Sequence, residues 1–99
     1  MDIETLQWAE EQARQYQVLT NPRRVLILCA LAGQEMSVGE IAAKVGASMQ
    51  NTSQHLHLMK DRGILESRRD GQTIYYSIAD PNLLNNIGLS TWKENPQGQ

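Results

Sequence analysis

The sequence has little cysteine, no long apolar run and no excess of positive charge. Its single cysteine, Cys29, cannot form an internal disulfide and cannot by itself bind zinc, so neither device can hold the fold together. No segment approaches the roughly 18 to 20 apolar residues of a membrane-spanning helix, and no basic start precedes an apolar stretch. We therefore expect a cytoplasmic protein without a membrane anchor, held together by a hydrophobic core.

The chain also lacks the residue patterns of an enzyme. It has no Cys-His or Ser-His-Asp arrangement that we can place and no glycine-rich loop to hold a phosphate. With 99 residues it can form one domain but has little bulk to enclose a substrate pocket. We predict a protein that is not an enzyme and has no cofactor. The domain should span residues 1–94, with a flexible tail at 95–99.

The formal net charge of −2 argues weakly against binding to nucleic acid, but the charges are unevenly distributed. Residues 44–73 hold five basic and three acidic side chains, a local balance of +2. The excess of acid lies elsewhere in the chain. The net charge therefore does not exclude a nucleic-acid surface in this segment.

The spacing of apolar residues predicts two helices in the first third of the chain. Over residues 3–19 they recur at mostly three- and four-residue steps, the pattern of an amphipathic helix, and this helix has few internal partners. Asn21 is suited to cap a second helix, with Pro22 in its first turn. Residues 25–32 are apolar nearly all round, so this helix should be central and end at Gly33.

Two short helices joined by a tight turn should follow. Ser37 can cap the first, Glu40 completes a Ser-x-x-Glu capping box, and Gly46 ends the helix. Ser48 can cap the second helix, which should run over residues 49–62. Two such helices with a glycine-containing turn form a helix-turn-helix unit. The residues predicted to face the core from the second helix are Thr52, Leu56 and Met59.

After the second helix the apolar period changes to that of a strand. Every second residue over 74–78 is apolar, and Asp70-Gly71 before this run is a strong signal for a β-hairpin. A last helix should begin at Asp80-Pro81. The order of elements predicts a mainly α (α+β) winged helix-turn-helix, with about five helices and one β-hairpin as the wing.

The polar residues of the second short helix form the surface that its core-facing residues leave free. Asn and Gln can make paired hydrogen bonds to an adenine edge and Ser can serve several bases, which suits the major groove. A plain solvent-facing side is the alternative, but the capping box, the turn and the hairpin favour DNA. The candidate DNA-binding residues of this helix are Gln50, Asn51, Ser53, Gln54 and His57.

Charged residues near the hairpin supply candidates for backbone contacts. Arg68 and Arg69 flank the predicted turn, from which they could reach phosphates or the minor groove. The alternative is that they only keep a hairpin edge soluble. Lys60 and Arg62 are expected to be phosphate contacts or solvated charges.

The chain carries an ordered series of short motifs. They are Asn21-Pro22-Arg23-Arg24, Ser37-Val38-Gly39-Glu40-Ile41-Ala42, Ser53-Gln54-His55-Leu56, Gly63-Ile64-Leu65 and Arg69-Asp70-Gly71 with Tyr75-Tyr76. Over about residues 10–84 the series resembles the ArsR family of bacterial and archaeal repressors. The resemblance implies a dimer, formed by the first and last helices, that reads an inverted repeat in double-stranded DNA. The predicted interface residues are Leu6, Trp8, Leu83, Ile87 and Trp92.

A winged-helix module that binds protein without reading DNA is the competing function. A protein-binding surface should expose apolar or aromatic anchors, whereas the face over residues 50–57 is polar. We therefore expect a homodimeric repressor. A small effector is left open and unidentified.

Many relatives in the family sense metals, and this chain departs from their patterns. Ser37 and Gly39 stand where arsenic- and cadmium-sensing members place a Cys-x-Cys pair, and no histidine follows Asp80 to form a zinc-type site. His55 and His57 point about 200° apart on a helix and cannot chelate one ion. We predict no metal site, and we expect His55 either to pack beneath the unit or to bind a backbone carbonyl.

The segment over residues 23–31 resembles the HlyU-like redox- and sulfide-responsive branch of the family. Cys29 falls on the first cysteine of that branch's sensing pair, but the second, expected near residues 90–92, is missing. A disulfide switch within the chain is therefore excluded. Cys29 is either an ordinary buried residue or a single-thiol sensor.

Overall fold

The computed structural model describes residues 1–86; the predicted tail at 95–99 and the interface candidates Ile87 and Trp92 lie outside them. The elements are α1 (Ile3–Val18), α2 (Pro22–Ala30), β1 (Met36–Ser37), α3 (Val38–Val45), α4 (Met49–Asp61), β2 (Leu65–Asp70), β3 (Thr73–Ile78) and α5 (Leu83–Asn86). They confirm the predicted winged helix-turn-helix order. Within residues 1–86, no helix combines the length and apolar character needed to span a membrane.

Helices α2, α3 and α4 begin at the predicted caps, whereas α5 begins at Leu83, just after the predicted start at Asp80-Pro81. The side chain of Asn21 accepts the backbone N–H of Arg23 at 2.9 Å. The Ser37 hydroxyl accepts the N–H of Glu40 at 3.2 Å, and the Glu40 carboxylate accepts the N–H of Ser37 at 2.9 Å, which completes the capping box. Gly46 ends α3 with a φ of 70°, a left-handed conformation that favours glycine. These local hydrogen bonds fix where the helix-turn-helix unit starts and turns.

The helix α2 is shorter than predicted. It ends at Ala30, and a turn carries the chain on to Gly33. The apolar run over residues 25–32 therefore extends two residues beyond the end of the helix, because residues of a buried turn are apolar as well.

The three strands form an antiparallel sheet in the order β1-β3-β2. Asp70 pairs with Thr73, so Gly71 and Gln72 make the two-residue turn of the wing. Strand β1 pairs Met36 with Tyr76 and was not predicted, because two residues are too few to show a period. The sheet thereby connects the wing to the start of α3.

The core lies among α2, α3, α4 and the base of the sheet. As predicted, Thr52, Leu56 and Met59 are fully buried. Tyr76 is also buried, whereas the other apolar positions of its strand, Ile74 and Ile78, are half-buried. The largest fully buried side chains are Ile27, Leu28, Leu31, Ile41, Leu56, Met59, Val18 and Thr52.

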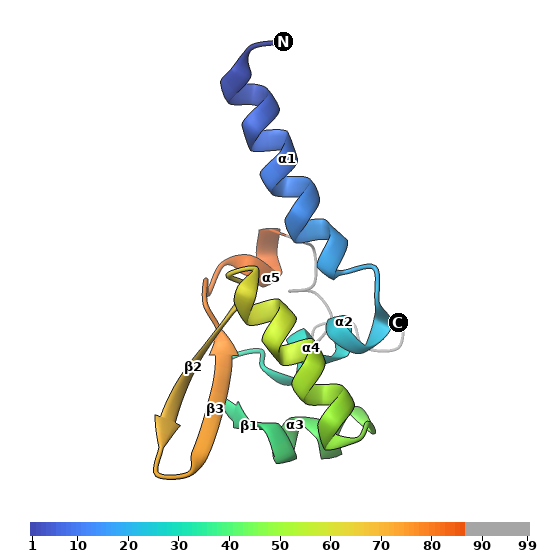
Figure 1. Ribbon diagram of the computed structural model, residues 1–99, viewed down its shortest axis with the longest axis vertical. Helices are drawn as coiled ribbons and strands as arrows, with labels where there is room; N and C mark the ends of the chain where they lie inside the picture. Colours follow the sequence, from blue (N-terminus) through green and yellow to red (C-terminus); the bar gives the residue numbers. More distant parts are fainter. Residues whose placement is uncertain (87–99) are drawn as a thin grey trace.

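Helix α1 projects away from the rest of the molecule (Figure 1). Its one buried residue is Val18, at its end, while Leu6 is 47% exposed and Trp8 is 64% exposed. Because they are two residues apart, Leu6 and Trp8 point to nearly opposite sides of α1. Leu83 differs from them, since it packs against the core of its own chain.

Candidate nucleic-acid interface

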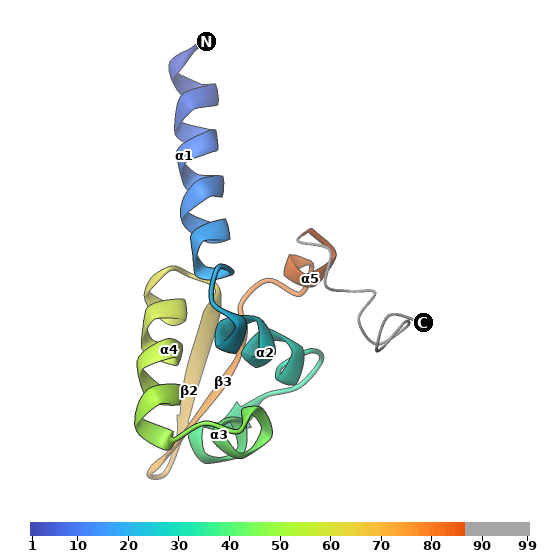
Figure 2. The same cartoon turned by 90° about the vertical axis from the view of Figure 1, so that its right-hand side faces the viewer.

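The start of α4 and the turn of the wing lie at the same end of the molecule, opposite the free end of α1 (Figure 1). Figure 2 shows the same arrangement after a quarter turn, with α3 beside them. The structure therefore brings the two predicted contact regions, one on a helix and one on a hairpin, onto one end of the protein.

The predicted reading residues do not all share one side of α4. At 100° per residue, Gln50, Gln54 and His57 fall within about 60° of one another. All three are exposed, and Ser53 beside them is half-buried. Asn51 is exposed about 100° around the helix from Gln50. Within residues 1–86, no hydrogen bond or ion pair engages any of these five side chains, so all remain able to contact a ligand.

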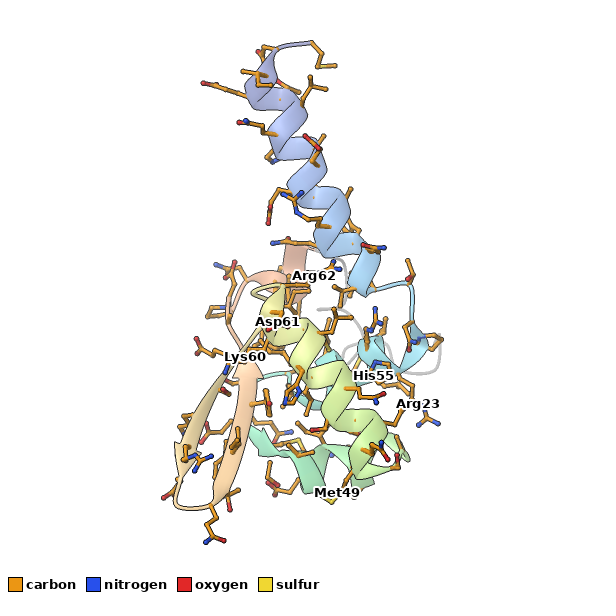
Figure 3. The ribbon with its side chains drawn as sticks, viewed as in Figure 1. Arg23, Met49, His55, Lys60, Asp61 and Arg62 are labelled. Atoms are coloured by element: carbon orange, nitrogen blue, oxygen red, sulfur yellow. The ribbon has the colours of Figure 1, made fainter. Side chains whose placement is uncertain are left out.

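Met49, the first residue of α4, is 60% exposed and was not among the predicted contact residues. Figure 3 shows it at the end of α4 that lies near α3. It borders a hollow of about 340 Å³ between the starts of α3 and α4 and the wing turn. Its place directly after the cap Ser48 could have singled it out, since the first turn of a reading helix contacts bases. The hollow is lined by Ser37, Val38, Gly39, Met49, Gln72, Thr73 and Ile74.

The far end of α4 has a different character. Asp61 is exposed one turn beyond His57 and adds negative charge to that end of the face, beside the exposed Lys60 (Figure 3). Arg62 donates to the backbone oxygen of Arg14 at 3.3 Å and to the Gln17 side chain at 3.5 Å. Arg62 thus ties α4 to α1 in place of the predicted phosphate contact or solvated charge. The amide and hydroxyl side chains of α4 that are exposed or half-buried are therefore concentrated in its first half.

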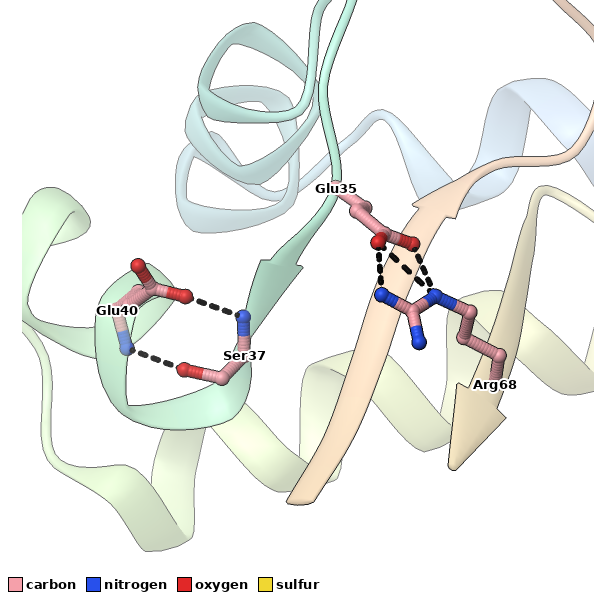
Figure 4. A network of polar contacts seen from close by, with 4 residues as sticks. All are labelled: Glu35, Ser37, Glu40 and Arg68. Carbon is pink, nitrogen blue, oxygen red and sulfur yellow. Dashed lines mark hydrogen bonds and ion pairs between the residues drawn. The ribbon is translucent and has the colours of Figure 1, made fainter. Parts of the chain in front are cut away.

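The two wing arginines have different surroundings. Arg69 is exposed, and within the described residues nothing pairs with its side chain. The guanidinium of Arg68 instead donates to the carboxylate of Glu35, as Figure 4 shows. No sequence pattern indicates this pair, because Glu35 lies in the segment before β1, far from the hairpin.

Two arginines at the start of α2 contact the helix-turn-helix unit formed by α3 and α4. Arg23 donates to the backbone oxygens of Val45 and Gly46 at 2.7 and 3.0 Å, which stabilises the turn after α3. Arg24 donates to Nδ1 of His55 at 3.3 Å. His55 is half-buried beneath the unit, as predicted, and burial, together with Arg24 and Arg23, lowers its pKa. In the sequence, both arginines stand out only as members of the motif Asn21-Pro22-Arg23-Arg24.

Cys29 is half-buried on α2, and burial raises the pKa of its thiol. A raised pKa favours the thiol over the reactive thiolate, so its surroundings do not activate it. Among residues 1–86, no group of three or more His, Cys, Asp or Glu side chains is placed to hold a metal ion.

Comparison with known families and proteins gives consistent matches. Residues 21–67 match the model of the bacterial regulatory protein, arsR family. The chain is 42% identical to nodulation protein NolR of Rhizobium meliloti over 80 residues, which are 81% of this chain and 66% of NolR. It is 45% identical to the HTH-type transcriptional regulator YgaV of Escherichia coli K12 over 71% of this chain and 72% of YgaV. The matched part thus spans about two thirds of these relatives.

Solved structures resemble the whole described fold. Reduced HlyU from Vibrio cholerae aligns with a TM-score of 0.81 at 28% identity, covering 95% of this chain and 98% of that one. The homodimeric winged helix-turn-helix DNA-binding domain Mb0332 from Mycobacterium bovis aligns with a TM-score of 0.81 at 28% identity. That alignment covers 100% of this chain and 92% of the Mb0332 fragment.

Proposed function

Because this chain belongs to the arsR family of bacterial regulatory proteins, we propose that it is a homodimeric transcriptional repressor that binds an inverted repeat in double-stranded DNA. The observation that carries the proposal is the exposed, unpaired polar face at the start of α4, beside the wing. In this docking mode α4 enters the major groove, where its first residues meet base edges. The similarity to a homodimeric DNA-binding domain and to named regulators supports it.

We propose that base reading is shared among the polar residues of the first half of α4. Gln50 and Gln54 have amides long enough to pair with an adenine edge, and Ser53 and His57 stand at the side of this pair. Asn51, farther around the helix, would contact the flank of the groove. Met49 adds an apolar contact of the kind that fits the methyl group of thymine.

We assign the wing's phosphate contact to Arg69. Its side chain is exposed next to the turn and carries a charge that no neighbour in the described structure neutralises. A contact of this kind adds affinity for every DNA sequence and makes binding sensitive to salt, because counterions leave the phosphates.

The proposed dimer gives a role to the exposed apolar side chains of α1. Ile3, Leu6 and Trp8 are each between 47% and 66% exposed, which is a large apolar surface to leave in water. Because Leu6 and Trp8 point to nearly opposite sides of α1, a second copy would have to enclose this helix to cover both. Such a dimer would present two copies of α4 to two half-sites. Leu83 packs within its own chain and would contribute less. Ile87 and Trp92 stay predictions for the interface.

The test is the salt dependence of binding to genomic fragments around the protein's own gene. The wild type should bind one inverted repeat tightly, with an affinity that falls steeply with salt. Arg69→Gln should make the slope of log affinity against log salt shallower by about 0.9 for each phosphate that the variant no longer neutralises. The control Arg14→Gln, on exposed α1, should leave the slope unchanged. Absence of specific binding to any fragment would instead favour the winged-helix protein-interaction module.

The same assay examines Cys29 as a sensor. Oxidised wild-type protein and Cys29→Ser are compared with the reduced protein. Because burial raises the pKa of this thiol, we expect oxidant to leave operator binding unchanged. Loss of binding in oxidised wild type but not in Cys29→Ser would establish a single-thiol switch.

A further inference from the structure

Arg68 reaches across the wing to a residue far away in the sequence. It lies on β2, and Glu35 lies directly before β1, with β3 between the two strands. To span that gap, the Arg68 side chain crosses over Tyr75, its partner on β3, with the guanidinium carbon 4.7 Å from the ring centroid. The contact therefore joins β2 to the residue directly before β1, across β3 (Figure 4).

The contact uses one edge of the planar guanidinium, where two nitrogens can donate to the same carboxylate. Nε of Arg68 lies 2.9 Å from both carboxylate oxygens of Glu35, and Nη2 also donates to Oε1. Hydrogen bonds from Arg68 lower the pKa of Glu35, and the carboxylate in turn raises the pKa of Arg68. The Nε–Nη2 edge of Arg68, one of the two edges that could bind a phosphate with two bonds, is thus already occupied by an anion.

Glu35 lies close to the start of the helix-turn-helix, so a contact with Glu35 can restrict where α3 begins relative to the wing. It is followed by Met36 and Ser37 of β1, and Ser37 is the residue whose capping box starts α3. The ion pair consequently links the middle of the wing to the start of the helix-turn-helix. Arg69, the next residue on the same strand, makes no such link within the described structure.

We propose that Glu35 and Arg68 form a brace that fixes the wing relative to α3 and α4, so that Arg68 acts in DNA binding as a positioning residue and not as a phosphate contact. The inference rests on the proposed function, and it divides the two wing arginines between two tasks. Arg69 supplies charge to the DNA, whereas Arg68 and Glu35 set the distance at which the wing and α4 meet it.

A double-mutant cycle on operator DNA tests the brace. Glu35→Gln and Arg68→Gln should each weaken binding by about two- to fivefold, the range for an exposed but bidentate pair. The double variant should bind operator DNA at least as tightly as the single variant with the lower affinity. All three variants should keep the wild-type slope of log affinity against log salt. A shallower slope for Arg68→Gln, effects of the two substitutions that add up, or unchanged binding by Glu35→Gln would each overturn the brace.

A second measurement needs no DNA and keeps the inference separate from the proposed function. Hydrogen exchange of the free protein is followed in peptides that cover β1, β2 and β3. Glu35→Gln and Arg68→Gln should speed exchange in the wing, while the neighbouring substitution Arg69→Gln should not. Unchanged exchange in both brace variants would reject the brace, even if the protein binds its operator. Faster exchange without any operator binding would reject only the proposed function.

Discussion

Nδ1 of His55 accepts a hydrogen bond from Nε of Arg24 over 3.3 Å, and this contact joins α2 to α4, the helix that carries the proposed reading face. Arg24 also donates to the backbone oxygen of Val18 at 3.5 Å, so the same side chain reaches the end of α1. Burial of His55, helped by the charges of Arg24 and Arg23, lowers its pKa. The neutral ring is favoured, because protonation would remove the acceptor and set two positive charges side by side.

The lowered pKa of His55 predicts a pH dependence of stability. The folded protein binds this proton less readily than the unfolded chain, whose histidine pKa is about 6.5. The contribution of neutral His55 should be fully present above about pH 6.5 and should disappear as the pH falls through the lowered folded value. Urea unfolding across this range measures it. His55→Gln should flatten the dependence and the exposed His57→Gln should not; equal curves for His55→Gln and wild type would contradict the assignment.

Replacing Gln54 by alanine tests base reading. Without the paired hydrogen bond, discrimination between the operator and random DNA should fall by about 1 to 3 kcal/mol, with affinity for random DNA nearly unchanged. Lys60→Ala, on the same helix, is the control and should affect both kinds of DNA to a similar extent. Fluorescence anisotropy on the two DNAs gives the numbers. If Gln54→Ala weakens binding to operator and to random DNA by the same factor, Gln54 does not read bases.

The exposed Met49 predicts a contact with a thymine methyl group, and single thymine-to-uracil replacements in the operator can locate it. Each replacement removes only a methyl group from the major groove. At one position in each half-site, uracil should weaken binding of the wild type several-fold, by roughly the transfer free energy of one methyl group. Met49→Ala should bind thymine and uracil alike there. If the variant keeps the wild-type preference at every position, another residue recognises the methyl.

Thr52 offers a stability test within the reading helix. Its hydroxyl oxygen is fully buried and, within the described structure, has no hydrogen-bond partner. Thr52→Val keeps the branched shape and removes the unpaired polar group, so the free energy of unfolding should rise by about 1 kcal/mol. Thr52→Ala, which leaves a void, should lower it. A destabilised valine variant would mean that the hydroxyl has a partner in solution.

The sequence by itself determined the order of the helices and the hairpin, the turns and the inward side of α4, but not the two-residue strand β1. Caps such as Ser37 with Glu40, and the turn at Gly71, act over two to four residues, so their chemistry is visible in a short stretch of chain. The burial of Thr52, Leu56 and Met59 follows from the helical repeat alone. The polar face opposite them was predictable for the same reason.

Only the tertiary structure decided what the long charged side chains do. Arg68 and Arg69 are neighbours in sequence, yet one is paired with a residue 33 positions away and the other is exposed. The partners of Arg62 on α1 and of His55 on α2 lie 31 to 48 positions away. Such side chains have many rotamers and no periodic signature, so their contacts depend on which strands and helices the fold places within reach.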